Sequence, residues 1–240
     1  MEIVDDDKTT HAPTSVGNDL DLLAERALEF VQAGSTVGLG SGRAARVFVR
    51  ALGRRAQRGL TITCVATSEV TARLAAEVGL RAVKLDETPL DLTVDGADEV
   101  DPDLSALKGS GGALVCERIV ARRLGTADSP DSRGEAHAGP RQPRTAPAEV
   151  LPFAVRFCAG RLRQLGFAPE VRQEGGRPLV TDSGNFTLDC ETAPLADPAM
   201  TKRAIDGIPG VVDTGLFLGT AERVLVANRG CVRELRRKGS

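Results

Sequence analysis

The chain has 240 residues, of which 41% are hydrophobic, so it can bury a full core as one large or two modest domains. Its net charge of -2 argues against a protein that binds nucleic acid through an overall basic field. No apolar run reaches the ~18 residues that a membrane span requires, and the acidic start MEIVDDDK is unlike a signal peptide, so we expect a cytoplasmic protein with no membrane partner.

The first half of the chain alternates strand-like and helix-like segments. After residues 1–18, whose mixed polar composition indicates a disordered tail, apolar residues recur at helical spacing over 20–31. Strands are then predicted at 37–39, 60–65, 80–85 and 90–94, with helices after residue 42, at 69–77 and at 113–121. This alternation predicts an α/β fold with a doubly wound, mostly parallel sheet.

A glycine turn joins the first predicted strand to the next helix. Gly40, Ser41 and Gly42 form this turn, and backbone N–H groups here can bind an anion. The segment lacks the complete GxGxxG pattern and the acidic residue that dinucleotide-binding proteins carry after the following strand. It therefore indicates an anion site and does not predict a nucleotide.

An acidic block follows the strand predicted at 90–94. Asp95 and Asp98 stand where the chain leaves the sheet, and open α/β sheets bind ligands at the carboxyl ends of their strands. Lys108 precedes a glycine-rich run, and Glu117 lies near the start of the next helix. Singly, such features are also typical of turns, helix caps and loops. One sugar-phosphate site would account for all four charged residues together.

The second half of the chain predicts a different architecture. A helix at 156–165 is followed by strands at 170–172, 179–181 and 186–189, a helix at 200–205 and a strand at 224–227. This order predicts a second, smaller α+β domain. We divide the chain into the tail at 1–18, a Rossmann-like catalytic domain at 19–125 and 212–240, an irregular Pro-rich segment at 126–149, and the small α+β domain at 150–211.

The segment 126–149 is unlike the chain around it. It contains no Val, Ile, Leu, Met or Phe, and prolines stand at positions 130, 140, 143 and 147. Proline cannot donate a hydrogen bond to a neighbouring strand, so a central strand is not expected here. Losing the buried side chains of a strand, at ~1.5–3 kcal/mol each, would put both stability and activity in question.

The cysteines and the C-terminus carry no expected chemistry. Five cysteines, at positions 64, 116, 158, 190 and 231, form no CxxC pair, and the chain has only two histidines. A metal site is therefore not expected, and we interpret the cysteines as reduced, mostly buried thiols. The locally basic stretch at 233–238 is interpreted as a solvated tail.

Several blocks of the sequence resemble one known family. DLTVDGADEVDPDLSALKGSGGALVCERIVA, at 91–121, is similar to the signature block of ribose-5-phosphate isomerase A. VGLGSG at 37–42 and ATSEVTARLAAEVG at 66–79 resemble its glycine loop and a following segment. Three later segments also resemble landmarks of the family: LPFA at 151–154, VTDSGNFTLD at 180–189 and IPGVVDTGLF at 208–217.

The resemblance implies an isomerase that interconverts D-ribose 5-phosphate and D-ribulose 5-phosphate through an enediolate, in the non-oxidative pentose phosphate pathway. It implies that Glu117 carries the proton, while Lys108, Asp95 and Asp98 open the sugar ring and hold its hydroxyls. It requires no cofactor and suggests a homodimer or homotetramer. The substrate-binding residues that it implies are Ser41, Gly42, Arg43, Ala44, Gly96, Ala97, Gly109, Ser110 and Gly111.

Two departures from the family pattern concern substrate binding. The glycine loop usually reads GTGST or GSGST, whereas Arg43 and Ala44 replace two hydroxyl-bearing residues here. Arg43 can compensate, because a guanidinium offers two donors to a phosphate, although a solvent-facing helix residue is the alternative. In segment 126–149 the family usually has an apolar strand and a substrate-binding lysine, for which Arg133 and Arg141 are the candidate replacements.

Three functions are compatible with these residues. The first is the isomerase, because all four acid, base and cation positions are filled. The second is a catalytically weak or inactive sugar-phosphate-binding protein of the same fold, suggested by segment 126–149. The third is a coenzyme A transferase, which shares a related fold and uses a glutamate as nucleophile. A DNA-binding regulator is not expected, since no helix-turn-helix segment precedes the first strand.

Overall fold

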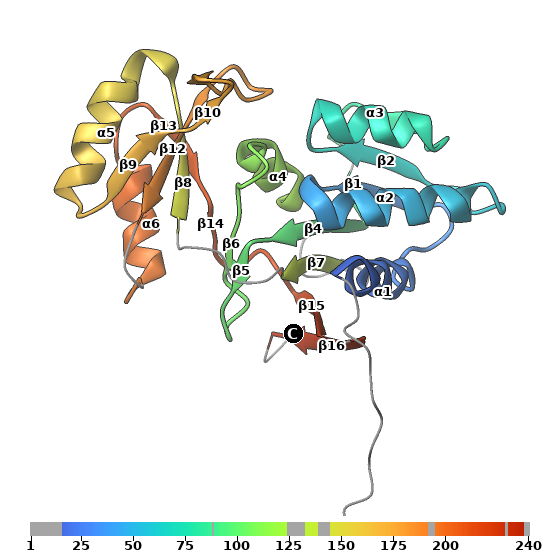
Figure 1. Cartoon of the computed structure of the whole chain (residues 1–240). Helices are drawn as coiled ribbons and strands as arrows, with labels where there is room; N and C mark the ends of the chain where they lie inside the picture. The colour runs from blue at the N-terminus through green and yellow to red at the C-terminus, as the bar shows by residue number, and fades with distance from the viewer. Residues whose placement is uncertain are drawn as a thin grey trace, which may run out of the picture.

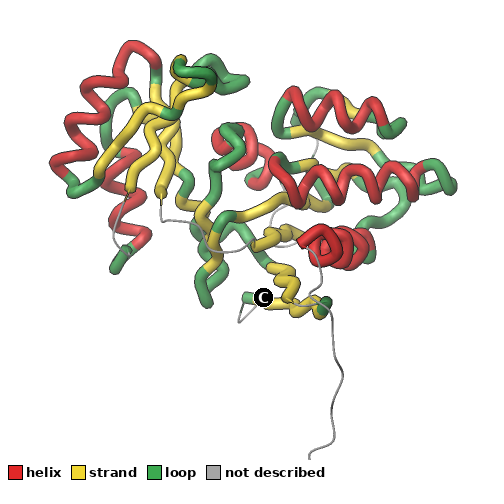
Figure 2. Tube along the Cα trace, viewed as in Figure 1, coloured by secondary structure: helices red, strands yellow, loops and turns green. Residues whose placement is uncertain are grey.

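The computed structural model describes residues 16–87, 89–123, 133–138, 145–191, 195–228 and 230–237. Two groups of strands and helices lie side by side within this part of the chain (Figure 1). One group is built on a larger sheet and the other on a smaller one (Figure 2). Of the disordered tail predicted at 1–18, residues 1–15 lie outside the described residues.

The larger sheet is mostly parallel. Its order over the described residues is β16 (Cys231–Arg236), β15 (Arg223–Asn228), β7 (Arg133–Ala138), β4 (Leu92–Ala97), β1 (Thr36–Leu39), β2 (Thr63–Ala66) and β3 (Ala82–Val83). All neighbouring strands run parallel except β15 and β16. The predicted fold class, a doubly wound and mostly parallel α/β sheet, is confirmed.

Helices pack against both faces of the larger sheet. α1 (Val16–Leu28), α2 (Gly42–Ala56) and α3 (Glu69–Glu77) form one buried apolar cluster with side chains of β1, β2, β4 and β15. α4 (Leu114–Ala121) lies on the other face, where Val120 clusters with Val65 and Leu90. Burial on both faces explains why these strands read as continuous apolar runs in the sequence.

The second group is an antiparallel sheet with helices on it. Its strand order is β13 (Val211–Thr214), β8 (Thr145–Val150), β12 (Phe186–Glu191) and β9 (Ala168–Val171). A short 3-10 helix at Pro152–Ala154 leads into α5 (Val155–Gln164), and α5 and α6 (Pro198–Asp206) bury their apolar sides against the sheet. A hairpin of β10 (Gln173–Glu174) and β11 (Arg177–Pro178) extends from it. The predicted smaller α+β unit is confirmed, whereas the exact domain boundaries remain our interpretation.

A short antiparallel sheet connects the two groups. Its order is β14 (Leu216–Phe217), β6 (Ala106–Leu107) and β5 (Glu99–Val100). β5 and β6 follow β4 of the larger sheet, whereas β14 follows β13 of the smaller one. Phe217 and Ala106 are buried in a common cluster with Leu114 of α4. This sheet therefore brings the end of β13 next to the segment that leaves β4.

The prediction that segment 126–149 holds no strand is wrong. β7 lies between β4 and β15, and it contains none of the four prolines of the segment. β8 does contain Pro147, but β13 ends opposite Ala148, so that at Pro147 the neighbour on this side is Gly215. The Gly215 N–H donates to the Pro147 carbonyl at 2.7 Å, the one backbone group that proline keeps. Backbone pairing thus forms strands here despite the composition.

For residues 231–236, the interpretation of the basic stretch at 233–238 as a tail is wrong, although Arg233 and Arg236 are solvent-exposed as expected. These residues form β16, antiparallel to β15, because Val232 and Leu235 pack on opposite faces of the sheet. Glu234 pairs with Arg26 at 2.9 Å and with Arg223 at 3.1 Å. The basic residues therefore belong to an edge strand that α1 and β15 hold.

Two other predicted strands are shorter than expected. The strand predicted at 80–85 is reduced to Ala82–Val83, which lies at the edge of the sheet and is exposed. Residues 179–181 contribute only an isolated bridge between Val180 and Phe186. Apolar alternation predicted these segments, but few neighbouring strands are available to pair with them.

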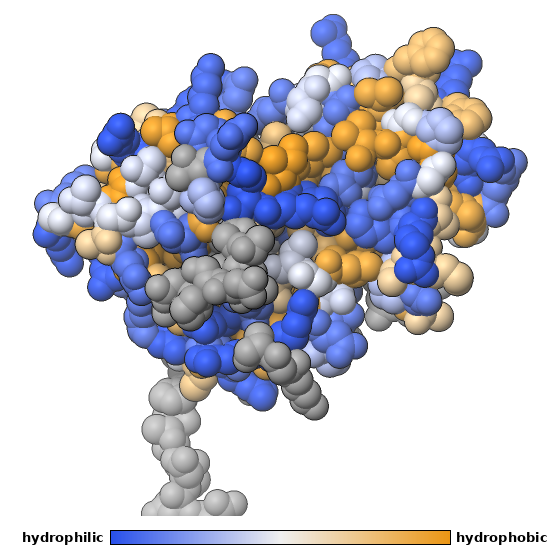
Figure 3. Space-filling view, turned by 180° about the vertical axis from the view of Figure 1, so that it is seen from behind, coloured by the Kyte–Doolittle hydropathy of each residue, from blue (hydrophilic) through white to orange (hydrophobic). Residues whose placement is uncertain are grey.

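The surface mixes apolar and charged side chains. Seen from behind, hydrophobic residues gather in the upper part of the molecule between stretches of hydrophilic ones (Figure 3). Phe153 and Phe157, near the start of α5, are among the exposed apolar residues. Such residues are common on protein surfaces, and we assign no partner to them. Among the described helices, none combines the length and apolar content that crossing a membrane requires.

The close contact between β1 and α4 predicts a stability difference between two glycine variants. A Cβ on Gly38 would lie 2.6 Å from the Val120 Cγ1 and from the Thr93 Oγ1, whereas a Cβ on Gly160 of α5 would meet nothing within 4 Å. Gly38→Ala should therefore destabilise the protein by about 1–3 kcal/mol. Gly160→Ala should stabilise it by about 0.5–1 kcal/mol, because alanine favours a helix interior. Urea unfolding measures both, and equal stability of Gly38→Ala and wild type would contradict this packing.

Candidate active site

The candidate site lies where the strand order of the larger sheet reverses. β1 continues into α2 on one face of the sheet, whereas the chain after β4 reaches α4 on the other face. The Gly40 N–H donates to the Val94 carbonyl at 2.9 Å, so the end of β1 lies beside Val94 of β4, one residue before Asp95. Open α/β sheets bind ligands outside the carboxyl ends of strands at such a position.

Asp95 lies inside β4 rather than in the turn after it, and its side chain points to the loop after β1. Its Oδ1 accepts hydrogen bonds from the backbone N–H of Ser41 at 3.1 Å and of Gly96 at 2.7 Å. A Cβ on Gly40 would lie 2.0 Å from this oxygen, so only glycine fits there. The glycine of the loop is therefore needed to admit the carboxylate.

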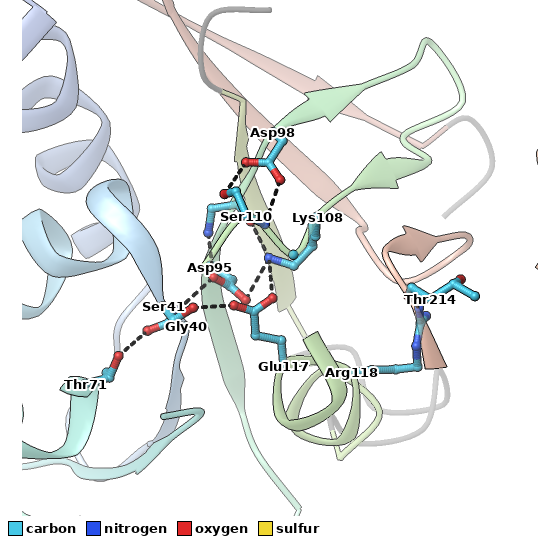
Figure 4. Close-up of polar contacts among 12 residues, drawn as sticks. Gly40, Ser41, Thr71, Asp95, Asp98, Lys108, Ser110, Glu117, Arg118 and Thr214 are labelled. Atoms are coloured by element: carbon cyan, nitrogen blue, oxygen red, sulfur yellow. Dashed lines mark hydrogen bonds and ion pairs between the residues drawn. The ribbon is translucent and has the colours of Figure 1, made fainter. Parts of the chain in front are cut away.

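Lys108, Asp95 and Glu117 form a buried ion cluster (Figure 4). The Lys108 Nζ lies 2.9 Å from the Asp95 Oδ2 and 3.2 Å from the Glu117 Oε2, and it also donates to the Gly96 carbonyl. The Ser41 hydroxyl donates to the Glu117 Oε1 at 2.5 Å. Lys108, Asp95 and Glu117 are 6%, 7% and 4% exposed. A lysine and a glutamate are thus held with defined partners in a site that largely excludes water.

Burial and neighbouring charges shift the proton affinities in this cluster. Burial, followed by the nearby charge of Glu117, raises the pKa of Asp95 to about 7, although Lys108 acts in the opposite direction. Burial disfavours the charged ammonium of Lys108, but the two carboxylates outweigh this effect and raise its pKa above the ordinary value. The cluster therefore has a permanent cation beside an acid that can hold a proton near neutral pH.

Asp98 contacts the glycine-rich loop rather than the ion cluster. Its Oδ1 accepts from the Ser110 hydroxyl at 2.7 Å and its Oδ2 from the Ser110 N–H at 3.2 Å. The Gly112 N–H donates to the Gly109 carbonyl at 3.1 Å. These N–H groups are therefore used within the loop and are not free to bind an anion.

Arg172, which directly follows β9 of the smaller sheet, binds the glycine-rich loop, and the sequence did not indicate this contact. Its Nη1 donates to the carbonyl oxygens of Gly109 at 2.6 Å and Ser110 at 3.3 Å. Its Nε donates to the Asp189 Oδ2 at 2.8 Å. No local motif can indicate that this arginine contacts a loop 62 residues away in the sequence. Only the three-dimensional contact identifies it.

The loop between β1 and α2 forms the other end of the site. Gly42 adopts a positive φ of 82°, and Ser41 stands at the N-cap with its side chain turned to Glu117 instead of to the helix. Arg43 is exposed and Ala44 half-buried in the first turn of α2. The Thr71 hydroxyl donates to the Gly40 carbonyl at 3.0 Å, another support that the sequence did not indicate. The N-terminus of α2 thus borders the ion cluster, as an anion site would require.

Most predicted site residues come together, but Asp98 lies outside the ion cluster and Ala97 lies in the core. A Cβ built on Gly96 would lie 3.8 Å from the Ala44 Cβ, so Gly96 lies against the start of α2. The side chain of Ala97 is buried in the core instead, where it packs with Leu104. Of the two arginines proposed to replace the missing lysine, only the strand position of Arg133 is described, and Arg141 lies outside the described residues.

The chain matches a known family over most of its length. The family model described as ribose 5-phosphate isomerase A (phosphoriboisomerase A) matches residues 63–230. The ribose-5-phosphate isomerase A of Roseiflexus sp. (strain RS-1) is 44% identical over 218 residues, which cover 88% of this chain and 93% of that protein.

Solved structures agree with this match. A D-ribose-5-phosphate isomerase in complex with phospho-erythronic acid is 30% identical, with a TM-score of 0.86 over 93% of this chain and 100% of that one. The ribose 5-phosphate isomerase A of Methanocaldococcus jannaschii is 29% identical, with a TM-score of 0.83 over 92% of this chain and 100% of that one.

The raised pKa of Asp95 predicts how stability depends on pH. Its pKa is about 7 in the folded chain and has an ordinary value of 3.8, so the folded state holds this proton more tightly than the unfolded state. The resulting stability is fully present below about pH 4 and is lost as the pH rises through about 7. Asp95→Asn cannot ionise and should lack this loss. Urea unfolding of both proteins between about pH 4 and pH 8 measures it, and a difference in unfolding free energy that is independent of pH would contradict the shift.

Proposed function

The chain belongs to the ribose-5-phosphate isomerase A family, and on this premise we propose that it interconverts D-ribose 5-phosphate and D-ribulose 5-phosphate. The observation that carries the proposal is the buried cluster of Asp95, Lys108 and Glu117. Both carboxylates lie within 3.2 Å of the Lys108 Nζ, so a base, a second acid and a cation stand together. An aldose–ketose isomerisation requires these groups, because a proton moves between adjacent carbons while negative charge develops on oxygen.

Glu117 serves as the base. Its carboxylate removes the proton from C2 of the open-chain aldose, the electron pair forms the C1–C2 double bond, and the C1 carbonyl oxygen becomes negatively charged. The proton then returns to C1, while the proton of the C2 hydroxyl moves to the C1 oxygen, which leaves a ketone at C2. The hydrogen bond from Ser41 and the ion pair with Lys108 orient both oxygens of the Glu117 carboxylate for this transfer.

Lys108 and Asp95 act on the oxygen atoms of the sugar. The ammonium of Lys108 stabilises the enediolate, since it stays charged and is fixed by two carboxylates before substrate binds. Asp95, with a pKa of about 7, can hold or release a proton when the ring opens and when the hydroxyl proton moves. Asp98 lies outside the ion cluster, where it is hydrogen-bonded to Ser110, and is suited to hold a sugar hydroxyl.

The phosphate lies at the N-terminus of α2 in this proposal. Backbone N–H groups of the first turn and the guanidinium of Arg43 are the donors available to it. The neighbour solved with phospho-erythronic acid supports a phosphorylated ligand. No reaction step requires a metal or cofactor, and the cytoplasmic location and the homodimer or homotetramer remain predictions.

The other two functions have less support. A catalytically inactive sugar-phosphate-binding protein was suggested by segment 126–149, but β7 and β8 supply strands there and the ion cluster is complete. A coenzyme A transferase needs a glutamate that can attack a thioester. Glu117 is 4% exposed and both its oxygens are engaged by Ser41 and Lys108, which favours proton transfer over nucleophilic attack.

Replacing Glu117 tests the function directly. Glu117→Gln keeps the size of the side chain but removes the base, so ribulose 5-phosphate formation should fall by roughly 10²- to 10⁴-fold. Purified protein treated with a chelator is assayed with ribose 5-phosphate, and circular dichroism checks that each variant is folded. Glu77→Gln, at an exposed position of α3, is the matched control and should retain wild-type turnover.

The outcomes of this assay separate the three functions. A folded wild type without turnover would refute the isomerase; saturable binding of ribose 5-phosphate in that case would favour the binding protein. Formation of a labelled thioester on wild type but not on Glu117→Gln would favour the transferase.

Arg43 predicts a separate effect on substrate affinity. If its guanidinium binds the phosphate, Arg43→Ala should raise KM for ribose 5-phosphate roughly tenfold while kcat changes little. Arg50→Ala, an exposed arginine two turns further along α2, is the control and should leave KM unchanged. Steady-state kinetics measure both, and an unchanged KM in Arg43→Ala would assign Arg43 to the solvent-facing side of the helix.

A further inference from the structure

Arg118 directly follows Glu117 in α4, and the two side chains leave the helix in different directions (Figure 4). Glu117 points toward Ser41 and Lys108, whereas Arg118 points toward the segment that carries Thr214. The Arg118 side chain is only 9% exposed. A buried guanidinium requires partners that compensate for lost hydration, and the proposed mechanism gives this one no role.

Within the described residues, the partners of Arg118 belong to one short segment, residues 213–217, which comprises the end of β13 and β14. Its Nε forms an ion pair with Asp213, and its Nη2 donates to the carbonyl oxygens of Thr214 at 2.6 Å and Leu216 at 3.1 Å. Its guanidinium also lies over the ring of Phe217, 3.9 Å from the centroid. A planar donor group with several acceptors fixes direction as well as distance. α4 is therefore tied rigidly to this segment.

The same segment holds Lys108. The Lys108 N–H donates to the Gly215 carbonyl at 2.9 Å, and Leu216 pairs with Leu107 in the short sheet. The Lys108 Nζ lies 5.3 Å from the centroid of the Phe217 ring. A Cβ on Gly215 would come within 2.1 Å of the Lys108 carbonyl oxygen, so the two backbones are in close contact. Lys108 thus takes its position from the segment that Arg118 binds.

The start of α4 is held by a second buried acid. Glu149 of β8 accepts hydrogen bonds from the Thr181 hydroxyl and the Asn185 amide, each at 2.9 Å, and it also interacts with the backbone N–H of Val115 in the first turn of α4. Glu149 stands opposite Asp213 in the register of β8 and β13. Two acids on neighbouring strands of the smaller sheet therefore anchor α4 on the side away from the site.

We propose that Arg118 is a positioning residue of the isomerase. By tying α4, which carries Glu117, to the segment that also holds β6 and Lys108, it sets the distance between the Glu117 carboxylate and the Lys108 ammonium. This inference rests on the proposed function. Glu117 depends on α4 and Lys108 depends on β6, and Arg118 joins α4 to the strand beside β6. Displacing a catalytic group by about 1 Å can lower the rate roughly 100-fold, even when substrate still binds.

The test measures kcat, KM and the deuterium isotope effect with ribose 5-phosphate carrying either isotope at C2. Arg118→Met keeps the bulk of the side chain and removes its donors, so kcat should fall roughly 10- to 100-fold while KM changes less than about threefold. The isotope effect on kcat should rise, because proton transfer then limits the rate more strongly. Arg118→Lys keeps the charge beside Asp213 but cannot serve two carbonyls in the same way, and should lie between Arg118→Met and wild type.

Arg223→Met is the matched control. Arg223 also pairs with an acid, Glu234, at 3.1 Å and lies over a phenylalanine ring, that of Phe30, at 4.2 Å, but it begins β15 at the end of the sheet away from the site. This variant should keep wild-type kcat and isotope effect per folded enzyme. If Arg118→Met only lowers the amount of folded protein, its kcat and isotope effect per folded enzyme will equal those of wild type. That result would overturn the proposal.

Three further outcomes keep the test decisive. If Arg118→Met does not fold, Asp213→Asn removes the charge that faces Arg118 while keeping the side chain's size, and unchanged kcat and isotope effect in this variant would overturn the proposal. A folded but inactive wild type would overturn the proposed function and this inference with it. An active wild type with an unaffected Arg118→Met would overturn this inference alone.

Discussion

The ion cluster of Asp95, Lys108 and Glu117 is the interaction on which the rest of the structure depends. Each charge is buried, and each is tolerable there only because the others compensate for the hydration that it has lost. The glycine at position 40 admits one carboxylate, and the hydroxyl of Ser41 orients another. Local features that look like separate loop residues in the sequence are therefore parts of one electrostatic arrangement.

The helix α4 connects this arrangement to the smaller sheet. One side of the helix presents Glu117 to the cluster, while the other side is held by Asp213 through Arg118 and by Glu149 through the first turn. The smaller sheet is thus a support for the site as well as a separate layer. Arg172 adds a contact of the same kind to the glycine-rich loop, since it joins Asp189 to two carbonyls of that loop.

Residues whose chemistry is expressed within a short motif could be predicted from the sequence. Asp95, Lys108 and Glu117 stand within one block, and the strand and helix around them follow apolar periodicity. The strand at 133–138 could not be predicted in this way, because its place depends on backbone pairing with β4 and β15 on either side. Composition describes side chains, whereas a central strand can form wherever two neighbours offer their hydrogen-bonding groups.

The sequence by itself determined the α/β class, the family resemblance and the candidate residues for proton transfer, because these follow from periodicity and from motifs shorter than one structural element. Only the tertiary structure decided that Ser41 and Lys108 engage the two oxygens of Glu117, and that Asp98 and Ala97 lie outside the cluster. It also identified Arg118 as the residue that joins α4 to the segment beside β6. Contacts between residues nearly 100 positions apart depend on how sheets and helices pack, and no local pattern in the chain records them.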